Sequence, residues 1–504
     1  MDALSRGLEE SANRLRRVWL EEVRLTSADF CFFGAAALFY TLPIVAANVP
    51  YAEDYGRHID GHGWDHDGRV LATWMMRILS FDGAVGALNP YSTIASAFLL
   101  ATSVFPVALG LLQGARTVAR VAALAVMTTP FALEVLWFRY DSLPMAASFA
   151  CVVVPFVLRN KPRWFAVAST AGVLACGLLY QPTASVFSLL LVAFTIQKVV
   201  DDHDGRDILA LWVAACIGVT AAAGLYFFVA WSLPLRLGGR ETPVPMNGAG
   251  LHAIVANVAS GWRHIACLFD ARYVAASAGL VGLTVVAALG YLTSGVTILR
   301  KVAMLAVLAT VPVLVCGPNL FLAKPNFGHR TLLGYAIVVL IFASLTIRAR
   351  HVPTAIRQGL VVGTLLPLML YSLNYAASVG NVMQSQTLLA REVIRAAVDA
   401  GGGSARFDRY LVNGSLPLTP ESQFAVKRFP IIGRGGMWRG VMLKKGNFYN
   451  SRFLPYFGLN GSFEPGADEP IDPCQYATLL SNGLVRIGGR NKTMLLDFEH
   501  TTCP

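Results

Sequence analysis

Long apolar runs alternate with short polar segments along most of the chain. About eleven of these runs approach the ~20 residues that an α-helix needs to cross a bilayer. The predicted spans are residues 30–48, 90–112, 118–138, 142–158, 164–180, 182–198, 209–233, 273–298, 302–322, 330–347 and 355–379. The pattern therefore predicts a polytopic α-helical membrane protein.

Composition agrees with this fold class. Apolar residues make up 55% of the 504 residues and charged residues only 14%, whereas a soluble protein carries about a quarter charged residues. A single soluble domain is therefore excluded. The net charge of +11 is spread among loops rather than gathered on one element, so we expect a lipid bilayer and no nucleic acid as partner.

The loops between the spans carry the charges that orient a membrane protein. If the N-terminus is cytoplasmic, the loops expected inside are short and basic, as the positive-inside rule requires. They hold Arg116 and Arg120, Arg159, Lys161 and Arg163, Lys198 and Arg206, Arg300 and Lys301, and Arg348, Arg350 and Arg357. An odd number of spans then places the C-terminal tail on the outer face.

Three regions follow from these patterns. Residues 1–29 mix Arg and Leu in the manner of a cytoplasmic amphipathic helix rather than a cleaved signal. Residues 30–380 form the transmembrane domain, with a first external loop at 49–89. Residues 381–504 form a small external α/β domain. Its predicted elements are a helix near 383–400 and strands at 409–412, 424–429, 441–444, 484–487 and 493–498.

Cysteine usage separates the same regions. Six cysteines lie in or beside apolar runs, where a thiol acts as a small hydrophobe. Cys474 and Cys503 are the pair in the polar tail. They allow a disulfide if the tail lies in an oxidising compartment, and the sequence does not decide whether they are bridged.

The unusual polar motifs fall on the outer face in this topology. A secondary transporter would place ionisable residues near mid-bilayer, but here the centres of the spans are almost free of charge. Glu134, near the outer end of its span, is the nearest exception. The clustering indicates chemistry at the outer membrane–water boundary.

The first external loop is the richest of these segments. Glu53 and Asp54 precede Arg57, and adjacent carboxylates point in different directions, so one of them is expected to act as a general base. The alternative is a solvated loop whose acids pair with Arg57 and Arg69. The apolar spacing of residues 69–81 predicts an interfacial helix.

The same loop invites a metal hypothesis, because His58, His62 and His66 recur every four residues. Gly61 and Gly63 disfavour a continuous helical ligand face, and no Cys joins the histidines. We expect no metal or other cofactor.

Three further outer motifs add candidates. Arg139, Tyr140 and Asp141 occupy a tight turn, where Arg139 and Asp141 either pair with each other or deliver their charges to a site. Tyr180-Gln181-Pro182 is either an aromatic-belt residue followed by a helix-starting Pro, or a motif whose Gln181 bonds sugar hydroxyls. Lys324 and Arg330 bracket another turn, as ligands for a phosphate or for lipid headgroups.

Taken in order, these residues resemble the Gtr-type, serotype-converting membrane glucosyltransferases that modify bacterial O-antigen, members of the GT-C class. The motifs are Glu53-Asp54-Tyr55-Gly56-Arg57, Gly63-Trp64, Gly68-Arg69, Arg139-Tyr140-Asp141-Ser142, Tyr180-Gln181-Pro182, His329 to Gly334 and Tyr375 to Gln386. The chain departs from the family pattern at Glu53, where Asp is usual, which leaves open which carboxylate is catalytic.

The resemblance implies transfer of glucose from a polyprenyl-phosphate donor to an envelope glycan, at the outer face of the bacterial inner membrane. A glycoside hydrolase generally needs two carboxylates, one of which protonates a poor leaving group. A phosphate leaves as a stabilised anion, so one base and several cations suffice. The alternatives are a GT-C enzyme that uses another lipid-linked sugar, and a flippase or transporter of lipid-linked glycans.

The roles expected from this chemistry are specific. Asp54 is the base, Glu53 is the second choice, and Asp141 positions the acceptor or the base. The residues expected to bind the donor phosphate or the substrate are Arg57, Arg69, Arg139, Tyr140, Gln181, Lys324 and Arg330.

Overall fold

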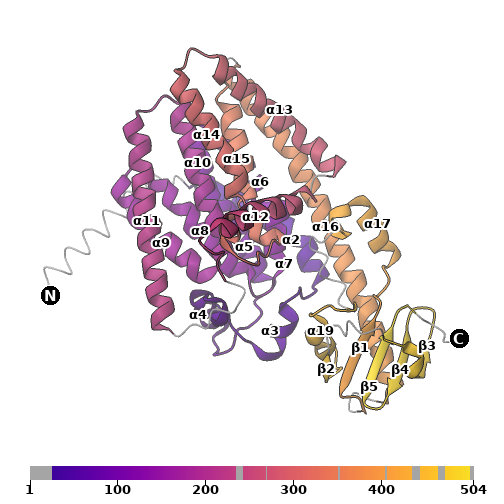
Figure 1. The fold of residues 1–504 in the computed structure, drawn as a ribbon. Helices are drawn as coiled ribbons and strands as arrows, with labels where there is room; N and C mark the ends of the chain where they lie inside the picture. Colours follow the sequence, from indigo (N-terminus) through magenta and orange to yellow (C-terminus); the bar gives the residue numbers. More distant parts are fainter. Residues whose placement is uncertain are drawn as a thin grey trace.

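The computed structural model describes residues 25–233, 242–267, 270–349, 352–402, 406–433, 443–463 and 471–499. Most of the amphipathic segment expected at 1–29 lies outside these residues, and so does Cys503. The described part is a bundle of long helices with a small sheet domain beside one end (Figure 1).

Eight helical segments are long and apolar enough to cross a membrane. Among the described residues these are Ser27–Ala47 (α2), Tyr91–Leu111 (α5), Pro162–Leu179 (α9), Gln181–Val200 (η3 and α10), Gly205–Ser232 (α11), Ala271–Thr293 (α13), His329–Ile347 (η6 and α15) and Thr354–Ala400 (α16). The protein is therefore a helical membrane protein by the length and composition of these segments.

A ninth span is formed if α6 (Arg116–Met127) and α7 (Pro130–Trp137), which meet at 59°, are counted as one. The bend has a local cause. Pro130 lacks an N–H and disfavours helical backbone at Thr129, which is extended with ψ 147° and caps α7 through its side chain.

The predicted number of eleven spans is not confirmed. The span expected at 142–158 is a helix of 12 residues, α8 (Ser142–Val153), continued by the 3₁₀ turn η2 (Val154–Leu158). The span expected at 302–322 is α14 (Ile298–Leu314), which has 17 residues and is followed by the 3₁₀ turn η5 (Gly317–Phe321). Both are helical segments that end before the predicted length, each beside a Pro.

Basic residues gather at one end of the bundle. Asp29, at the start of α2, accepts contacts from Arg116 and from Arg120, whose Nη2 lies 2.7 Å from Asp29 Oδ1. Arg348, after α15, pairs with Asp201, after α10, at 3.0 Å. Loops predicted to share one face therefore meet at the same end of the molecule.

The final long helix differs from its prediction. A span at 355–379 and a separate polar helix at 383–400 were expected, but α16 is one helix of 47 residues. Its length is about 70 Å at 1.5 Å per residue, so it runs from the bundle into the sheet domain (Figure 1). Gly380 lets α16 approach α2, because a Cβ there would lie 3.1 Å from the carbonyl oxygen of Pro43.

An amphipathic helix, α12 (Gly248–Ala266), lies across the long helices (Figure 1) and has no counterpart in the sequence prediction. Asn257 on α12 donates to the carbonyls of Leu320 and Leu322 at 3.0 and 2.9 Å. This contact holds α12 against the turn that follows α14.

The tail contains a five-stranded sheet in the order β2-β1-β5-β4-β3. The strands are β1 (Arg409–Asn413), β2 (Ser462–Phe463), β3 (Ala477–Ser481), β4 (Arg486–Arg490) and β5 (Thr493–Asp497). β1 pairs in parallel with β2 and β5, and β4 pairs antiparallel with β3 and β5. The strands expected at 409–412 and 493–498 are confirmed as β1 and β5. The strand expected at 484–487 overlaps β4 by two residues, and β2 and β3 were not predicted.

The strand expected at 424–429 is wrong. This segment belongs to the helix α17 (Pro420–Arg428), which carries helix start signals that the strand prediction overlooked: Thr419 as N-cap, Pro at the first position and Glu421 in the first turn. Of the strand expected at 441–444, residues 441 and 442 lie outside the described residues, and Lys444 forms only an isolated bridge with Ser415. Cys474 forms a disulfide whose partner also lies outside them.

Candidate functional site

Four segments that are far apart in the sequence meet at the end of the bundle opposite the basic loops. They are α3 (Asp54–Asp60), the turn between α7 and α8, the 3₁₀ turn η3 (Gln181–Thr183) and the 3₁₀ turn η6 (His329–Leu332). Figure 1 shows α3 and α4 (Val70–Ser80) at this end, near the tail domain. The helix expected at 69–81 is therefore confirmed as α4. Acidic and arginine side chains on or next to these segments gather at this end. We call them the acid–arginine cluster, which comprises Glu53, Asp54, Arg57, Glu134, Asp141 and Arg330.

Asp54 begins α3 and is fully buried. Its Oδ2 accepts hydrogen bonds from the backbone N–H groups of Tyr51 and Arg139, both at 3.0 Å. Its Oδ1 has no hydrogen-bond partner among the described residues. Burial, reinforced by the neighbouring charge of Asp141, raises the pKa of Asp54 to about 7 despite the two hydrogen bonds. Such a carboxyl group can exchange a proton near neutral pH.

Asp141 links two motifs of the first loop to the turn after α7. Its Oδ2 lies 2.5 Å from Arg57 Nη1, and its Oδ1 accepts from Trp64 Nε1 at 2.7 Å. Arg57 also lies over the ring of Trp64, 4.4 Å from the centroid. Asp141 therefore pairs with Arg57 and not with its neighbour Arg139, which donates to Asn48 Oδ1 at 2.8 Å.

Glu53 points to a different part of the cluster. Its Oε1 lies 3.3 Å from Arg330 Nη2 and accepts from the hydroxyl of Tyr449 at 3.0 Å. About a quarter of its side chain, 26%, stays exposed. Arg330 stacks over Phe138, 4.3 Å from the ring centroid. Glu53 and Asp54 thus differ in partner and in access to solvent, as the different directions of adjacent side chains predict.

Glu134 joins the same cluster although no role was predicted for it. It accepts from the hydroxyl of Tyr51 at 3.1 Å and from the backbone N–H of Arg330 at 2.7 Å. The signal was present in the sequence, because a carboxylate at the end of an otherwise apolar helix is costly and is expected to have a function.

Arg69 and Gln181 form a neighbouring pair. Arg69 Nε donates to Gln181 Oε1 at 3.1 Å and its guanidinium lies over Tyr180, 4.7 Å from the centroid. Gln181 Nε2 donates to the carbonyl of Asp67 at 3.0 Å. The amide of Gln181 therefore joins the first loop to the start of α10.

Tyr140 and Lys324, which were also predicted to bind the donor or substrate, lie in different surroundings. Tyr140 is buried, and its hydroxyl lies 3.2 Å from His58 Nδ1. Burial raises the pKa of Tyr140 to about 12, so it stays protonated at neutral pH. Lys324 is exposed, and in the described part of the chain no hydrogen bond or ion pair joins it to the acid–arginine cluster.

The histidines of the first loop have separate surroundings. His58 contacts Tyr140, whereas His62 contacts Asp60. Within the described ranges, no three His, Cys, Asp or Glu side chains are grouped so that they could hold a metal ion.

The tail touches the segment that carries Glu53 and Asp54. Tyr55 lies against Phe453 and Tyr456 of α19 (Asn450–Tyr456), with ring centroids 5.0 and 5.1 Å apart. Gly56 leaves room for Arg452, because a Cβ at this position would overlap the Arg452 guanidinium. No sequence motif of the tail predicted this contact.

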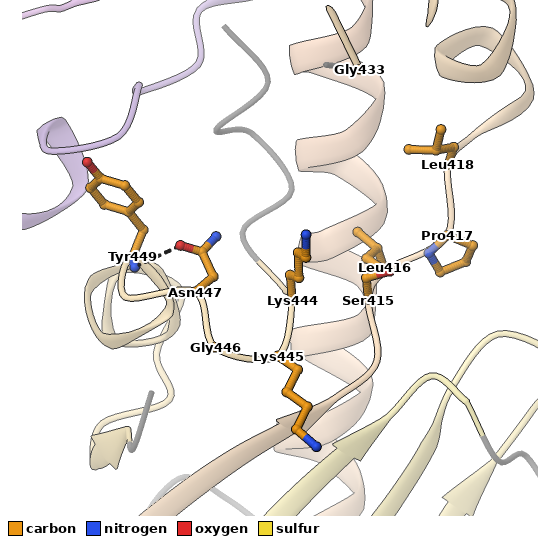
Figure 2. Close-up of a pocket in the computed structure, with 10 residues that line it drawn as sticks. All are labelled: Ser415, Leu416, Pro417, Leu418, Gly433, Lys444, Lys445, Gly446, Asn447 and Tyr449. Atoms are coloured by element: carbon orange, nitrogen blue, oxygen red, sulfur yellow. Dashed lines mark hydrogen bonds between the residues drawn. The ribbon is translucent and has the colours of Figure 1, made fainter. Parts of the chain in front are cut away.

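A cavity of about 670 Å³ in the tail ends at the same place. Lys444, Lys445, Asn447 and Tyr449 line it. Figure 2 shows the ring of Tyr449 directed away from the loop that bears Lys444 and Lys445. The hydroxyl at the end of that ring is the one that donates to Glu53. The tail therefore contributes a side chain to the acid–arginine cluster.

A family model described as "Glucosyl transferase GtrII" matches residues 42–341. The chain belongs to the GtrII glucosyltransferase family. The resemblance noted from the sequence motifs is thus confirmed. The matched range contains Glu53, Asp54, Asp141, Glu134 and Arg330, so the acid–arginine cluster lies inside the part of the chain that defines this GtrII member.

A curated protein of Salmonella phage P22, described as an uncharacterised 55.3 kDa protein in the gtrB 5′ region, is also similar. It is 23% identical over 244 residues, which is 47% of this chain and 50% of that protein. The chain thus spans about half the length of this curated relative. No solved structure matches the chain.

Proposed function

We propose that the protein is a glycosyltransferase that moves glucose from a polyprenyl-phosphate donor to an envelope glycan such as O-antigen. The observation that carries the proposal is the meeting of carboxylates and arginines at one end of a helical bundle, in a member of the GtrII family. A base beside cations is the set of groups that transfer from a sugar phosphate requires.

The proposed reaction is a single displacement at the anomeric carbon. A carboxylate of the cluster takes the proton of an acceptor hydroxyl, and the acceptor oxygen forms a bond to the anomeric carbon. The bond between that carbon and the phosphate oxygen breaks, and polyprenyl phosphate leaves with the electron pair. The arginines stabilise the charge of the departing phosphate.

Asp54 is the proposed base. Its pKa of about 7 and its unpartnered Oδ1 suit proton transfer near neutral pH. Glu53 is the alternative, because it keeps exposed surface beside Arg330, whereas Asp54 is enclosed. Asp141 has both oxygens engaged by Arg57 and Trp64, which supports a positioning role.

The donor phosphate is assigned to the arginines that border the carboxylates. Arg57 Nε has no hydrogen-bond partner within the described ranges. Arg69 and Arg330 lie over aromatic rings, and each contacts one side-chain oxygen, of Gln181 and Glu53 respectively. Lys324 is exposed and suits the donor headgroup region. Arg139, Tyr140 and Gln181 are assigned to substrate binding. The arginines provide the positive charge that the phosphate needs, so the proposal includes no metal or other cofactor.

The proposed location is the bacterial inner membrane. The N-terminus and residues 1–29 are assigned to the cytoplasm, residues 30–380 to the transmembrane GT-C-like domain, and the tail 381–504 to the periplasm. The disulfide of Cys474 supports an oxidising compartment for the tail. Buried residues midway along the bundle, such as Leu100, Val104 and Phe149, are apolar, which supports an enzyme over a flippase with a polar path through the membrane.

The test uses membranes that contain the wild type, Asp54→Asn, Glu53→Gln or the control Asp67→Asn, whose exposed carboxylate lies in the same loop. Each is incubated with radiolabelled polyprenyl-phosphate glucose and an envelope glycan extract. We expect the wild type and the control to transfer label, also in the presence of EDTA, and Asp54→Asn to lose about 100-fold or more.

Different outcomes refute different parts of the proposal. Near-normal transfer by Asp54→Asn with loss in Glu53→Gln would assign the base to Glu53. Transfer by the wild type only with another lipid-linked sugar would refute glucose as the donor sugar. If the folded protein transferred no sugar from any of the donors, the proposed glycosyltransferase activity would be refuted.

A further inference from the structure

A second cavity lies outside the acid–arginine cluster, where α3, the outer part of α16 and α19 meet. Its volume is about 810 Å³. The lining residues that matter here are His58 on α3, Arg391, Arg395 and Asp399 on α16, and Tyr456 and Phe457 at the end of α19. We call it the α3–α16–α19 groove. Neither the sequence motifs nor the family match, which ends at residue 341, assigns it a role.

The groove carries two arginines and one carboxylate, Asp399, so the charge of these three side chains is net positive. Arg391 and Arg395 are four residues apart on α16, so they lie one above the other on one face of the helix. Both are exposed, and within the described ranges neither forms an ion pair or a hydrogen bond. Like charges at this spacing repel each other, and an anion bound between them would relieve the repulsion.

An aromatic wall faces these charges. The rings of Tyr456 and Phe457 have centroids 4.9 Å apart and stand nearly perpendicular, at 82°. His58 lies against Tyr456 with ring centroids 5.1 Å apart. Rings that combine an apolar face with a polar edge suit the mixed apolar and hydroxyl surface of a sugar. The groove therefore joins a site for an anion to a surface for a carbohydrate.

The groove borders α3, the helix that begins with Asp54. His58 lies one turn of α3, about 6 Å, from Asp54. It contacts the hydroxyl of Tyr140, which directly precedes Asp141. A chain of sugars in the groove would thus have its end near the carboxylates.

Distance separates the groove from the bilayer. Arg391 follows residue 379, where the apolar stretch of α16 ends, by 12 residues of continuous helix, a rise of about 18 Å along the helix axis. This is beyond the reach of lipid headgroups at that boundary, so the occupant is a soluble part of a substrate rather than the membrane.

We propose that the α3–α16–α19 groove binds an anionic group of the acceptor glycan, a carboxylate or a phosphate, between Arg391 and Arg395, with a neighbouring sugar on Tyr456. The inference rests on the proposed function, because it assumes that a glycan is the acceptor. It extends that function by naming acidic glycans as the preferred acceptor class.

The test measures binding separately from catalysis. Full-length protein in nanodiscs of zwitterionic lipid is titrated with trigalacturonic acid, with phosphorylated maltotriose and with neutral maltotriose. The variants are the double substitution Arg391→Gln/Arg395→Gln and the control Arg490→Gln/Lys492→Gln, which removes the same charge from exposed positions of the sheet. Thermal melts check that each variant is folded.

We expect the wild type and the control to bind one of the acidic trisaccharides at least tenfold more tightly than the neutral one. The double variant should lose this preference. Preference for trigalacturonic acid identifies a carboxylate, and preference for phosphorylated maltotriose identifies a phosphate. Equal binding of all three sugars by the wild type, or an unchanged preference in the double variant, would overturn the proposal.

The transfer assay distinguishes this proposal from the proposed function. With acidic acceptor fractions, the double variant should raise the acceptor KM at least tenfold and leave kcat unchanged. If no protein transfers sugar but the acidic preference is lost only in the double variant, the groove is supported and the proposed enzyme is refuted. If the double variant transfers sugar with the same acceptor KM as the wild type, the proposed role of the groove is refuted and the proposed enzyme activity is supported.

Discussion

Asp54 and Glu53 are neighbours in the sequence but occupy different electrostatic surroundings. Asp54 is enclosed and bonded to two backbone N–H groups, whereas Glu53 is partly exposed and contacts Arg330 and Tyr449. Desolvation disfavours a charged carboxylate, which is why the pKa of Asp54 rises to about 7. Burial and hydrogen-bond partners therefore separate two residues that a sequence motif treats alike.

The first prediction concerns pH. If Asp54 is the base, kcat/KM rises with pH through about 7 and then levels, because the active form is the deprotonated one. Since the raised pKa favours the protonated form in the folded state, the stabilisation from this group is present at low pH and is lost as pH rises through about 7. Transfer rates and melting temperatures between pH 5 and 8 measure both effects.

The control for this prediction is the Asp54→Asn variant, whose melting temperature should lose that part of the pH dependence. A kcat/KM that stays flat between pH 5 and 8, as the ordinary carboxyl pKa near 4 would give, would contradict the assignment of Asp54.

The second prediction concerns the indole of Trp64. Trp64→Phe keeps an aromatic ring beneath Arg57 but removes the N–H that donates to Asp141. A buried carboxylate that loses a donor costs about 1–3 kcal/mol, so we expect transfer to fall about 10- to 100-fold. Steady-state kinetics in membranes measure the loss.

Trp137→Phe is the matched control. Trp137 is as buried as Trp64, and its Nε1 has no hydrogen-bond partner in the described part of the chain. The same atoms are removed, but no hydrogen bond is lost. Equal effects of the two substitutions would show that ring volume, rather than the bond to Asp141, matters.

At the scale of elements, the tail helix α19 and the loop helix α3 form one unit. Tyr55 of α3 belongs to the same apolar cluster as Phe453 and Leu454 of α19 and Ile394 of α16. Because α16 continues from the bundle into this cluster, it connects the membrane region to the sheet. The position of α3, and so of Asp54, therefore depends on the tail.

The third prediction tests this coupling. Tyr449→Phe removes the hydroxyl that donates to Glu53 from the tail. Hydrogen bonds to charged groups contribute about 1.5–3 kcal/mol, so we expect transfer to fall about tenfold or more while the protein remains folded. Steady-state kinetics measure the transfer rate, and thermal melts show whether the variant is folded.

Tyr476→Phe serves as the comparison, because Tyr476 lies in the tail but away from α3, beside Gly488 of the sheet. It should leave transfer unchanged. A Tyr449→Phe variant as active as the wild type would show that the tail contact does not support the site.

On the scale of the whole molecule, polar chemistry is divided between two ends of the bundle. Arg116 and Arg120 meet Asp29 at one end, and the acid–arginine cluster occupies the other. Most buried side chains between them are apolar, and Leu100, Phe105 and Leu190 are fully buried. Each end is therefore expected to face a different aqueous compartment.

The fourth prediction assigns these compartments. Single cysteines replace Lys324, at the cluster end, and His203, at the basic end, in a background without the native free thiols. An impermeant maleimide should label Lys324→Cys in cells whose outer membrane is permeabilised, and His203→Cys only after the inner membrane is broken. The reverse pattern would overturn the proposed orientation.

Local signals explain which parts of the fold were predictable. The apolar lengths of α2, α5 and α11 are properties of short windows, so hydropathy located these helices within a few residues. The break within α6 and α7 and the continuation of α16 past residue 379 depend on neighbouring segments. The strand expected at 424–429 is part of a helix instead, because the Thr419 cap and the Pro at the first position start α17 despite the β-propensity of the segment.

The sequence by itself determined the helical membrane class, the family and the set of motifs at one end, because hydropathy and charge act over short stretches of chain. Only the tertiary structure decided which side chains contact one another in the acid–arginine cluster. Arg57 and Asp141 are 84 residues apart, and Glu53 and Tyr449 are 396 apart. Burial and hydrogen bonding arise when such segments meet, so the raised pKa of Asp54 and the tail's contribution to the site have no local signal.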